Sequence, residues 1–197
     1  MNLELIGGNI MALAHNSFVS FNEYEKLGEE SEEILKYIDG VICMSPSTSI
    51  KHQLVSSNLH TEFGMFLKGK KCKVFAAPTV IQLSIGDIED KKIVIPDLSI
   101  ICDENNFTND RYLGVPTLII EILSSSNQAH DLVTKFNLYM KYRVKEYWII
   151  NPMKQAITVY TLNREGLYEQ ADIKATSGTI ESIVIEGFKV ELETIFL

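Results

Sequence analysis

Two short, strongly apolar runs constrain this chain most, because each holds a single carboxylate. The runs cover residues 93–101 and 118–123, and the acids are Asp97, which follows Pro96, and Glu121. Both runs are rich in isoleucine and bounded by turn residues, which predicts strands with little solvated surface. A carboxylate in such a strand is costly unless a cation or a hydrogen-bond donor pairs with it. The two acids therefore predict either a divalent-cation site on a sheet or solvated and salt-bridged strand ends.

A lysine in the next segment bears on this choice. Residues 131–143 have a helical pattern whose inward stripe holds the apolar positions 132, 136, 139 and 140. Lys135 lies on that stripe, so its ammonium must extend along its stem to solvent or meet an anion. One available anion is Asp131, which is four residues earlier and would form an exposed helical ion pair. The other is the carboxylate site on the two strands, or a phosphate bound there.

A series of short motifs runs in order through nearly the whole chain. The motifs are Tyr37-Ile38-Asp39-Gly40, Met44-Ser45-Pro46-Ser47, Ile50-Lys51-His52-Gln53, Val74-Phe75-Ala76-Ala77-Pro78, Pro96-Asp97-Leu98-Ser99, Ile120-Glu121-Ile122-Leu123-Ser124, Asp131 with Lys135, and Glu146-Tyr147-Trp148-Ile149. In order and spacing, over residues 18–190, they resemble the Uma2 family of endonucleases, a branch of the PD-(D/E)xK nuclease superfamily. The chain has Leu123 where the superfamily motif has lysine, and Ser125 where the family has proline.

The resemblance implies a fold and a site. The fold is α+β, a restriction endonuclease-like αβββαβ core with a mixed sheet and additional antiparallel strands. Asp97 and Glu121 would be the catalytic metal carboxylates, with the backbone carbonyl of Ile122 as a third ligand. Lys135 would replace the displaced motif lysine as the third catalytic residue. The implied metal is Mg²⁺, with Mn²⁺ as a possible substitute, and such ions support phosphodiester hydrolysis.

Three further residues are accessory candidates. The resemblance places His52 near the active site, where it would bind a water or a phosphate, although a half-buried histidine on a helix also has an ordinary structural role. Ser124 and Ser126 would donate hydrogen bonds to a phosphate or cap the loop before the next helix. Tyr147 and Trp148 form an aromatic pair in a strand, which favours core packing.

The other patterns predict the remaining elements. The capping-box pattern at residues 20–23 predicts a helix over 21–27, and Asp39-Gly40 predicts a hairpin turn within 34–44. Ser47 or Thr48 would cap a helix to residue 67, with buried positions at Ile50, Leu54, Leu59, Phe63 and Phe66. Strands are expected over 73–76, 80–85, 92–102, 117–124, 146–150, 157–160, 168–175 and 180–185.

Length and composition favour one domain. A chain of 197 residues can bury one substantial core, and we expect a single domain over 18–197 after a loosely ordered N-terminal arm over 1–17. No apolar run reaches the roughly 18 residues that span a bilayer, and no basic region precedes the apolar residues 3–13, so neither a membrane segment nor a secretory signal is expected. Three cysteines without CxxC spacing favour reduced thiols in the cytoplasm, and argue against zinc or a disulfide framework.

Charge leaves two classes of function open. The first is a Mg²⁺-dependent DNA endonuclease that works as a homodimer. The second is an inactive nuclease-fold protein that binds nucleic acid or a protein partner. The net charge of −8 opposes contact with phosphates and favours the second class. Basic stretches at 68–73 and 141–145 are either phosphate contacts or ordinary solvated surface. Retention of Asp97, Glu121 and Lys135 together favours the first class.

Overall fold

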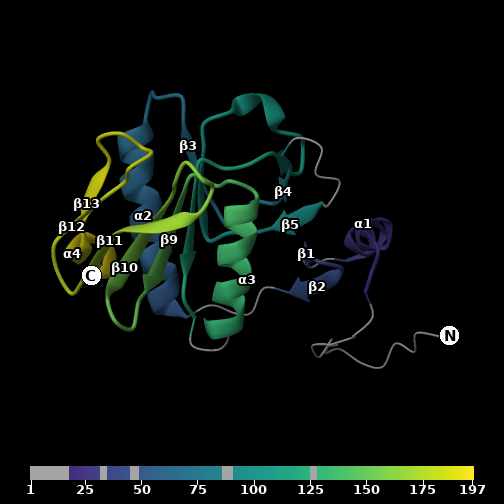
Figure 1. Ribbon diagram of the computed structural model, residues 1–197, viewed down its shortest axis with the longest axis horizontal. Helices are drawn as coiled ribbons and strands as arrows, with labels where there is room; N and C mark the ends of the chain where they lie inside the picture. Colours follow the sequence, from purple (N-terminus) through teal and green to yellow (C-terminus); the bar gives the residue numbers. More distant parts are fainter. Residues whose placement is uncertain (1–17, 32–34, 45–48, 86–90, 125–127) are drawn as a thin grey trace. The chain divides into compact units, whose positions relative to one another are not determined.

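The computed structural model describes residues 18–31, 35–44, 49–85, 91–124 and 128–197 (Figure 1). The predicted arm over 1–17 lies outside these residues. The chain divides into two compact units, Met1–Ser45 and Pro46–Leu197, and each is described by itself. The single-domain organisation over 18–197 stays a prediction. None of the described helices is long and apolar enough to cross a membrane.

The first unit holds a helix and a hairpin that the local sequence specifies. Helix α1 (Phe21–Glu30) begins with the predicted capping box, in which Ser20 and Glu23 bond to each other's backbone. Strands β1 (Leu35–Ile38) and β2 (Val41–Met44) then pair around Asp39 and Gly40. The φ angles of these two turn residues are 50° and 78°, as the tight hairpin turns favoured by Asp-Gly require.

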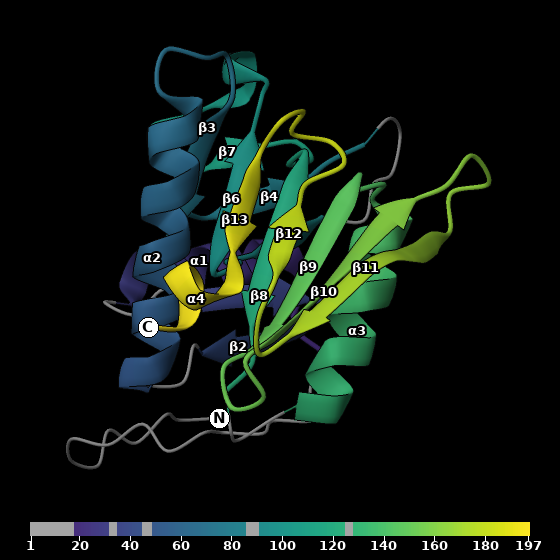
Figure 2. The same ribbon diagram turned by 90° about the vertical axis from the view of Figure 1, so that its left-hand side faces the viewer.

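The second unit is built on a six-stranded sheet whose strand order is β11-β10-β9-β8-β6-β3 (Figure 2). The strands are β3 (Lys73–Ala76), β6 (Leu98–Ile101), β8 (Leu118–Ile122), β9 (Glu146–Asn151), β10 (Ala156–Leu162) and β11 (Tyr168–Ala175). Only the β8–β9 pair among them is parallel, and α3 (Gln128–Lys141) connects these two strands. The predicted crossover helix and mixed sheet are therefore confirmed.

Alternate residues of β8 point to different helices, which defines the two faces of the sheet. Leu118, Ile120 and Ile122 belong to the main core, together with buried residues of α2 (Ile50–Leu67). Glu121, on the opposite face, bonds to side chains of α3. In chain order, α2, β3, β6, β8, α3 and β9 form the predicted αβββαβ core.

Smaller elements complete the second unit. Strand β4 (Ile81–Leu83) pairs with β5 (Lys92–Val94) and β7 (Tyr112–Leu113), and η1 (Glu104–Asn106) is a short 3₁₀ turn. At the C-terminal end, β12 (Thr179–Glu181), β13 (Lys189–Glu191) and α4 (Leu192–Phe196) contribute Ile180, Val190, Leu192 and Ile195 to the main core.

The prediction of one strand over residues 92–102 is wrong. The run contains two strands, β5 and β6, which belong to different sheets. The break falls at Ile95-Pro96, where proline has no N–H to donate to a ladder. As a consequence, Asp97 lies immediately before β6 rather than within a strand.

The predicted start and buried face of α2 also need correction. Ser49, not Ser47 or Thr48, caps the helix and accepts from the backbone N–H of His52. The buried residues are His52, Val55, Leu59, Phe63 and Leu67, whereas the predicted Ile50 and Leu54 are exposed. The helix carries apolar residues on more than one face, so periodicity alone did not identify the face that packs on the sheet.

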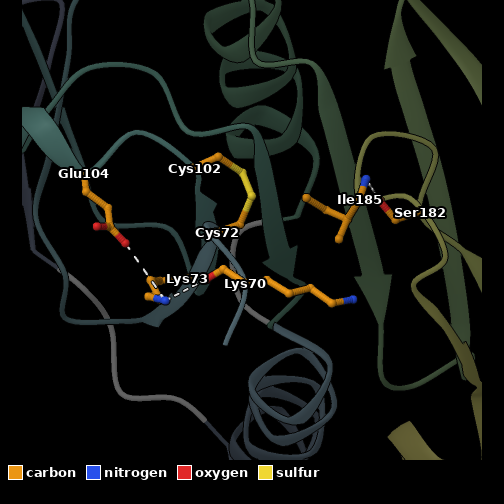
Figure 3. The surroundings of a disulfide bond; sticks show 7 residues. All are labelled: Lys70, Cys72, Lys73, Cys102, Glu104, Ser182 and Ile185. Carbon is orange, nitrogen blue, oxygen red and sulfur yellow. Dashed lines mark hydrogen bonds and ion pairs between the residues drawn. A yellow bond between two sulfur atoms is a disulfide. The ribbon is translucent and has the colours of Figure 1, made fainter. Parts of the chain in front are cut away.

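The prediction that the cysteines are reduced is wrong for two of them, because Cys72 and Cys102 form a disulfide (Figure 3). Strands β3 and β6 pair antiparallel with Lys73 opposite Ile101. The next position outward on each strand is a cysteine, so the two side chains meet at the sheet. Their separation of 30 residues hid this proximity in the sequence. The side chain of Cys43 lies outside the described residues.

The basic stretch around the disulfide makes contacts of its own. Lys70 lies over the ring of Phe66, with its Nζ 3.2 Å from the ring centroid. Lys73 donates to the carbonyl of Lys70 at 2.7 Å and lies 4.0 Å from a carboxylate oxygen of Glu104 (Figure 3). Contact between this surface and DNA phosphates stays a prediction.

Candidate active site

Asp97 and Glu121 meet across the β6–β8 pair. Leu98 is opposite Ile120 in the antiparallel register, so the next positions along each strand, 97 and 121, are also opposite each other. A direct contact supports this placement, because Oδ2 of Asp97 accepts a hydrogen bond from the backbone N–H of Ile122 at 2.7 Å. The register therefore places the two acids on neighbouring segments of the sheet, and the predicted convergence of their carboxylates stays a prediction. Their sharing of a cation stays a prediction.

Asp97 has a histidine partner from the first turn of α2. The Nε2 atom of His52 lies 3.3 Å from Oδ2 of Asp97, and the exposed fractions of the two side chains are 5% and 19%. Burial lowers the pKa of His52, but the hydrogen bond and charge of Asp97, the charge of Glu121 and the Ile122 backbone together raise it above its ordinary value. The contact with Asp97 therefore shifts the titration of His52 toward higher pH.

Glu121 is held on both oxygens by side chains of α3. Lys135 Nζ lies 2.8 Å from Oε2, and the Tyr139 hydroxyl donates to Oε1 at 2.7 Å. Lys135 and Tyr139 are one helical turn apart, so they leave α3 on the same side. Glu121 is buried and the Lys135 side chain is only 13% exposed. The lysine therefore belongs to the carboxylate site and not to a solvated face; the Asp131 side chain lies outside the described residues.

The placement of these charges is not explained by stability alone. Taking a lysine and a glutamate out of water costs several kcal/mol per ion, and their attraction offsets this only with good geometry and additional hydrogen bonds. An apolar pair of similar volume would fill the same space without that cost. The structure nevertheless places an Asp97–His52 pair and a Glu121–Lys135 pair on neighbouring segments of the sheet. Clusters of this kind are characteristic of functional sites.

The donor set fits a hard divalent cation. The carboxylates of Asp97 and Glu121 and the carbonyl of Ile122 are oxygen donors, the type that Mg²⁺ and Mn²⁺ prefer. Within the described part of the chain, no group of three or more His, Cys, Asp or Glu side chains is arranged to hold a metal ion. A metal at this site would therefore depend on water and substrate for its other ligands, which is usual for Mg²⁺ and unusual for structural zinc.

The remaining candidates divide among three outcomes. Ser124 follows β8 and is half-buried, while Ser126 lies outside the described residues. Tyr147 and Trp148 are fully buried in β9, so the prediction of core packing is confirmed. Sequence reasoning placed Tyr139 on the inward stripe of its helix but missed its bond to Glu121. Its position one turn after Lys135 was the available signal.

A protein-family model matches residues 21–193 of the chain, and its description is "Putative restriction endonuclease" (Uma2). Two proteins of Synechocystis sp. are similar in sequence, both with names that describe them as uncharacterized. The protein slr1290 is 28% identical over 160 residues, which cover 78% of this chain and 82% of that protein. The protein sll1609 is 26% identical over 145 residues, which cover 72% and 80% respectively.

A solved structure shares the fold. It is the crystal structure of a protein from Anabaena variabilis, described as a putative nuclease belonging to DUF820. The TM-score is 0.68 with 19% sequence identity, and the match covers 90% of this chain and 97% of the other. The nuclease-like fold inferred from the strand order is therefore also found in an experimental structure.

Proposed function

The chain belongs to the Uma2 family, and we propose that it is a metal-dependent endonuclease that hydrolyses phosphodiester bonds of DNA, with Mg²⁺ as the metal and Mn²⁺ as a substitute. The observation that carries this proposal is the buried contact between Lys135 and Glu121 at 2.8 Å, opposite Asp97 in the strand register. Two acids can bind a cation, and a lysine beside them can act on a phosphate that the cation binds. In this protein the two acids and the lysine belong to three separate segments of the chain.

The residues divide the chemical work. Asp97, Glu121 and the carbonyl of Ile122 would hold the metal, which when bound supplies Lewis-acid polarisation of the phosphate and a more acidic water. Lys135 places its Nζ at the Glu121 carboxylate. There its ammonium form can orient the attacking water or stabilise charge on the phosphate, and its neutral amine form could accept a proton from the water. His52 would add a second positive group at Asp97 and so favour the approach of an anionic substrate.

Positive groups within the site bear on the net negative charge of the chain. A net charge of −8 repels DNA at long range. Within the site, however, Lys135 offsets one of the two carboxylates, and a bound divalent cation would make the local charge positive. Binding of DNA would then depend strongly on the metal, because an acidic surface does not supply the phosphate neutralisation on which non-specific affinity rests.

Replacement of Asp97 by asparagine tests the proposed function. Asparagine keeps an acceptor for the N–H of Ile122, so the fold is expected to persist while the charged metal ligand is lost. We expect Mn²⁺ to raise the melting temperature of the wild type but not of Asp97→Asn, and plasmid nicking to fall by at least about 100-fold, in the range that removal of a key catalytic group produces. The measurements are thermal unfolding with and without Mn²⁺, and gel assays of supercoiled plasmid.

Asp172→Asn is the matched control, because Asp172 forms a surface pair with Lys174 and should behave as the wild type. Equal Mn²⁺ stabilisation in Asp97→Asn would remove Asp97 from the metal site. A wild type that binds Mn²⁺ and DNA without cleaving would favour the alternative, a nuclease-fold binding module, for which the acidic charge of the chain is the supporting observation.

We also expect a homodimer. A two-fold pair would present two sites to the two strands of a duplex, and closed C2 pairs are the commonest assemblies of soluble proteins. The measurement is light scattering at micromolar concentration, with a mass of twice 22.3 kDa as the expected result. A mass of one chain would contradict this expectation without affecting the assignment of the site.

A further inference from the structure

We propose that Tyr139 is a positioning residue of the active site, which acts by fixing the orientation of the Glu121 carboxylate. The inference rests on the proposed function and deepens it. The Tyr139 hydroxyl donates to Oε1 of Glu121 at 2.7 Å, and the tyrosine is fully buried in α3. Glu121 would be a metal ligand in the proposed enzyme, so a donor on its other oxygen belongs to the ligand-orienting shell of the site.

The position of the hydroxyl is fixed by packing. The ring of Tyr139 lies edge-on to the ring of Tyr147, with centroids 5.2 Å apart and an interplanar angle of 69°. Tyr147 belongs to β9, which pairs in parallel with β8 and places Ile149 opposite Glu121. The aromatic contact therefore packs the tyrosine against β9, the strand that pairs with the one carrying Glu121. A ring held in this way directs its hydroxyl to one place.

The Glu121 carboxylate needs partners on both oxygens to keep one orientation. The terminal torsion of a glutamate has a broad energy profile, so a single partner on one oxygen leaves the carboxylate plane free to turn. Lys135 alone, at 2.8 Å from Oε2, would be such a partner. With Tyr139 on Oε1, both oxygens are bound from one side of α3 and the plane is fixed. A preset carboxylate binds a cation without first losing rotational freedom, and it keeps Lys135 at the same distance.

A neighbouring tyrosine, Tyr168, has a similar packing role, but among the described residues it does not contact those of the proposed metal site. The Tyr168 hydroxyl donates to the backbone carbonyl of Val144 at 2.9 Å, and its ring packs with Tyr147 at a centroid distance of 6.1 Å. Tyr139 and Tyr168 thus contact the same aromatic residue, and each donates a hydrogen bond through its hydroxyl. The Tyr139 bond to a carboxylate is the stronger of the two, and only Tyr139 donates to an acid of the proposed metal site.

The experiment compares Tyr139→Phe with Tyr168→Phe, using Mn²⁺ alone as the ligand and calorimetry to measure its dissociation constant. We expect Tyr139→Phe to weaken Mn²⁺ binding by about 10-fold or more, as loss of a ligand-orienting hydrogen bond does at other metal sites, and Tyr168→Phe to leave it unchanged. Tyr139→Phe should also lose more thermal stability than Tyr168→Phe, because its hydroxyl bonds a carboxylate, so the Mn²⁺ affinity is the deciding measurement. Cleavage by Tyr139→Phe should recover partly at high Mn²⁺, because the metal ligands themselves are intact.

A double variant separates action through Glu121 from a general loosening of the fold. If Tyr139 acts by positioning Glu121, then Tyr139→Phe added to Glu121→Gln should produce no further loss of Mn²⁺ affinity. Equal Mn²⁺ affinity in Tyr139→Phe and the wild type would overturn the positioning role and leave the proposed function in place. A wild type that neither binds Mn²⁺ nor cleaves plasmid would overturn both.

Discussion

Replacing Lys135 by methionine is expected to lower plasmid cleavage by about 100- to 10,000-fold, the usual contribution of a positioned acid or base group. The aliphatic stem of the lysine is replaced by a side chain of similar length, so the packing of α3 against β8 is retained. What is lost is the ammonium at 2.8 Å from Oε2 of Glu121. The metal ligands remain, and the group that would act on the water or the phosphate is absent.

Loss of the Lys135 ammonium is also expected to change the free energy of unfolding. Removing one partner of a buried ion pair costs about 3–5 kcal/mol, because the other charge is left buried without compensation. In Lys135→Met that charge is Glu121, which still accepts from Tyr139. A divalent cation can then take the place of the ammonium. The rise in melting temperature caused by Mn²⁺ is therefore expected to be at least as large in the variant as in the wild type.

The measurement is the rate of supercoiled plasmid nicking in Mn²⁺, beside thermal unfolding with and without the metal. Lys154→Met, at an exposed lysine outside both basic stretches, is the control and should cleave normally. Lys135→Arg should also be poor, because a guanidinium is bulkier and does not readily lose a proton. A fully active Lys135→Met variant would remove Lys135 from the catalytic set, even for a protein that proves to be a nuclease.

The acids and the lysine could be found from the sequence because each breaks a local rule. Asp97 and Glu121 interrupt runs that otherwise predict buried strands, and Lys135 lies on the inward stripe of a helix. A charged residue at a position that the pattern assigns to the core needs a partner, and the three residues are within reach of one another along the chain. The αβββαβ order followed from the same patterns, together with the family resemblance.

Other features depend on contacts between segments that are distant in the sequence, so no local sequence pattern predicts them. The Cys72–Cys102 disulfide follows from the register of β3 with β6, which periodicity does not specify. The buried face of α2 was misassigned because apolar residues occur around much of its circumference, and only the sheet selects which of them are covered. The role of the Tyr139 hydroxyl was hidden for a simpler reason, since a tyrosine on an inward stripe already has an explanation as core.

Glu146 is a buried acid that the proposed chemistry does not use. It lies at the start of β9 with no exposed surface, and its Oε2 accepts from the backbone N–H groups of Ile183 and Val184, at 2.8 Å each. The indole N–H of Trp148 donates to its other oxygen. Residues 183 and 184 lie between β12 and β13. The hydrogen bonds of Glu146 therefore connect the C-terminal hairpin to β9 of the main sheet.

Glu146→Ala is therefore expected to lower the free energy of unfolding by at least about 3 kcal/mol, because a buried donor without an acceptor costs about 1–3 kcal/mol and the three donors of Glu146 lose theirs. The change also leaves a cavity between β9 and the C-terminal hairpin. The measurement is urea unfolding followed by tryptophan fluorescence, since Trp148 lies at the site. Glu181→Ala, an exposed acid in β12, is the control and should change stability by less than about 0.5 kcal/mol.

The pH dependence of Glu146→Gln tests the same carboxyl group independently. Burial raises the pKa of Glu146 above its ordinary value of 4.5, and the N–H donors only partly oppose this shift. Between 4.5 and the raised pKa, the folded protein binds more protons at this group than the unfolded chain, so the contribution of Glu146 to stability falls as the pH rises. Glutamine does not titrate. The stability advantage of the wild type over Glu146→Gln should therefore narrow with rising pH, and an advantage that widens would mean that the donors, not burial, control this carboxyl group.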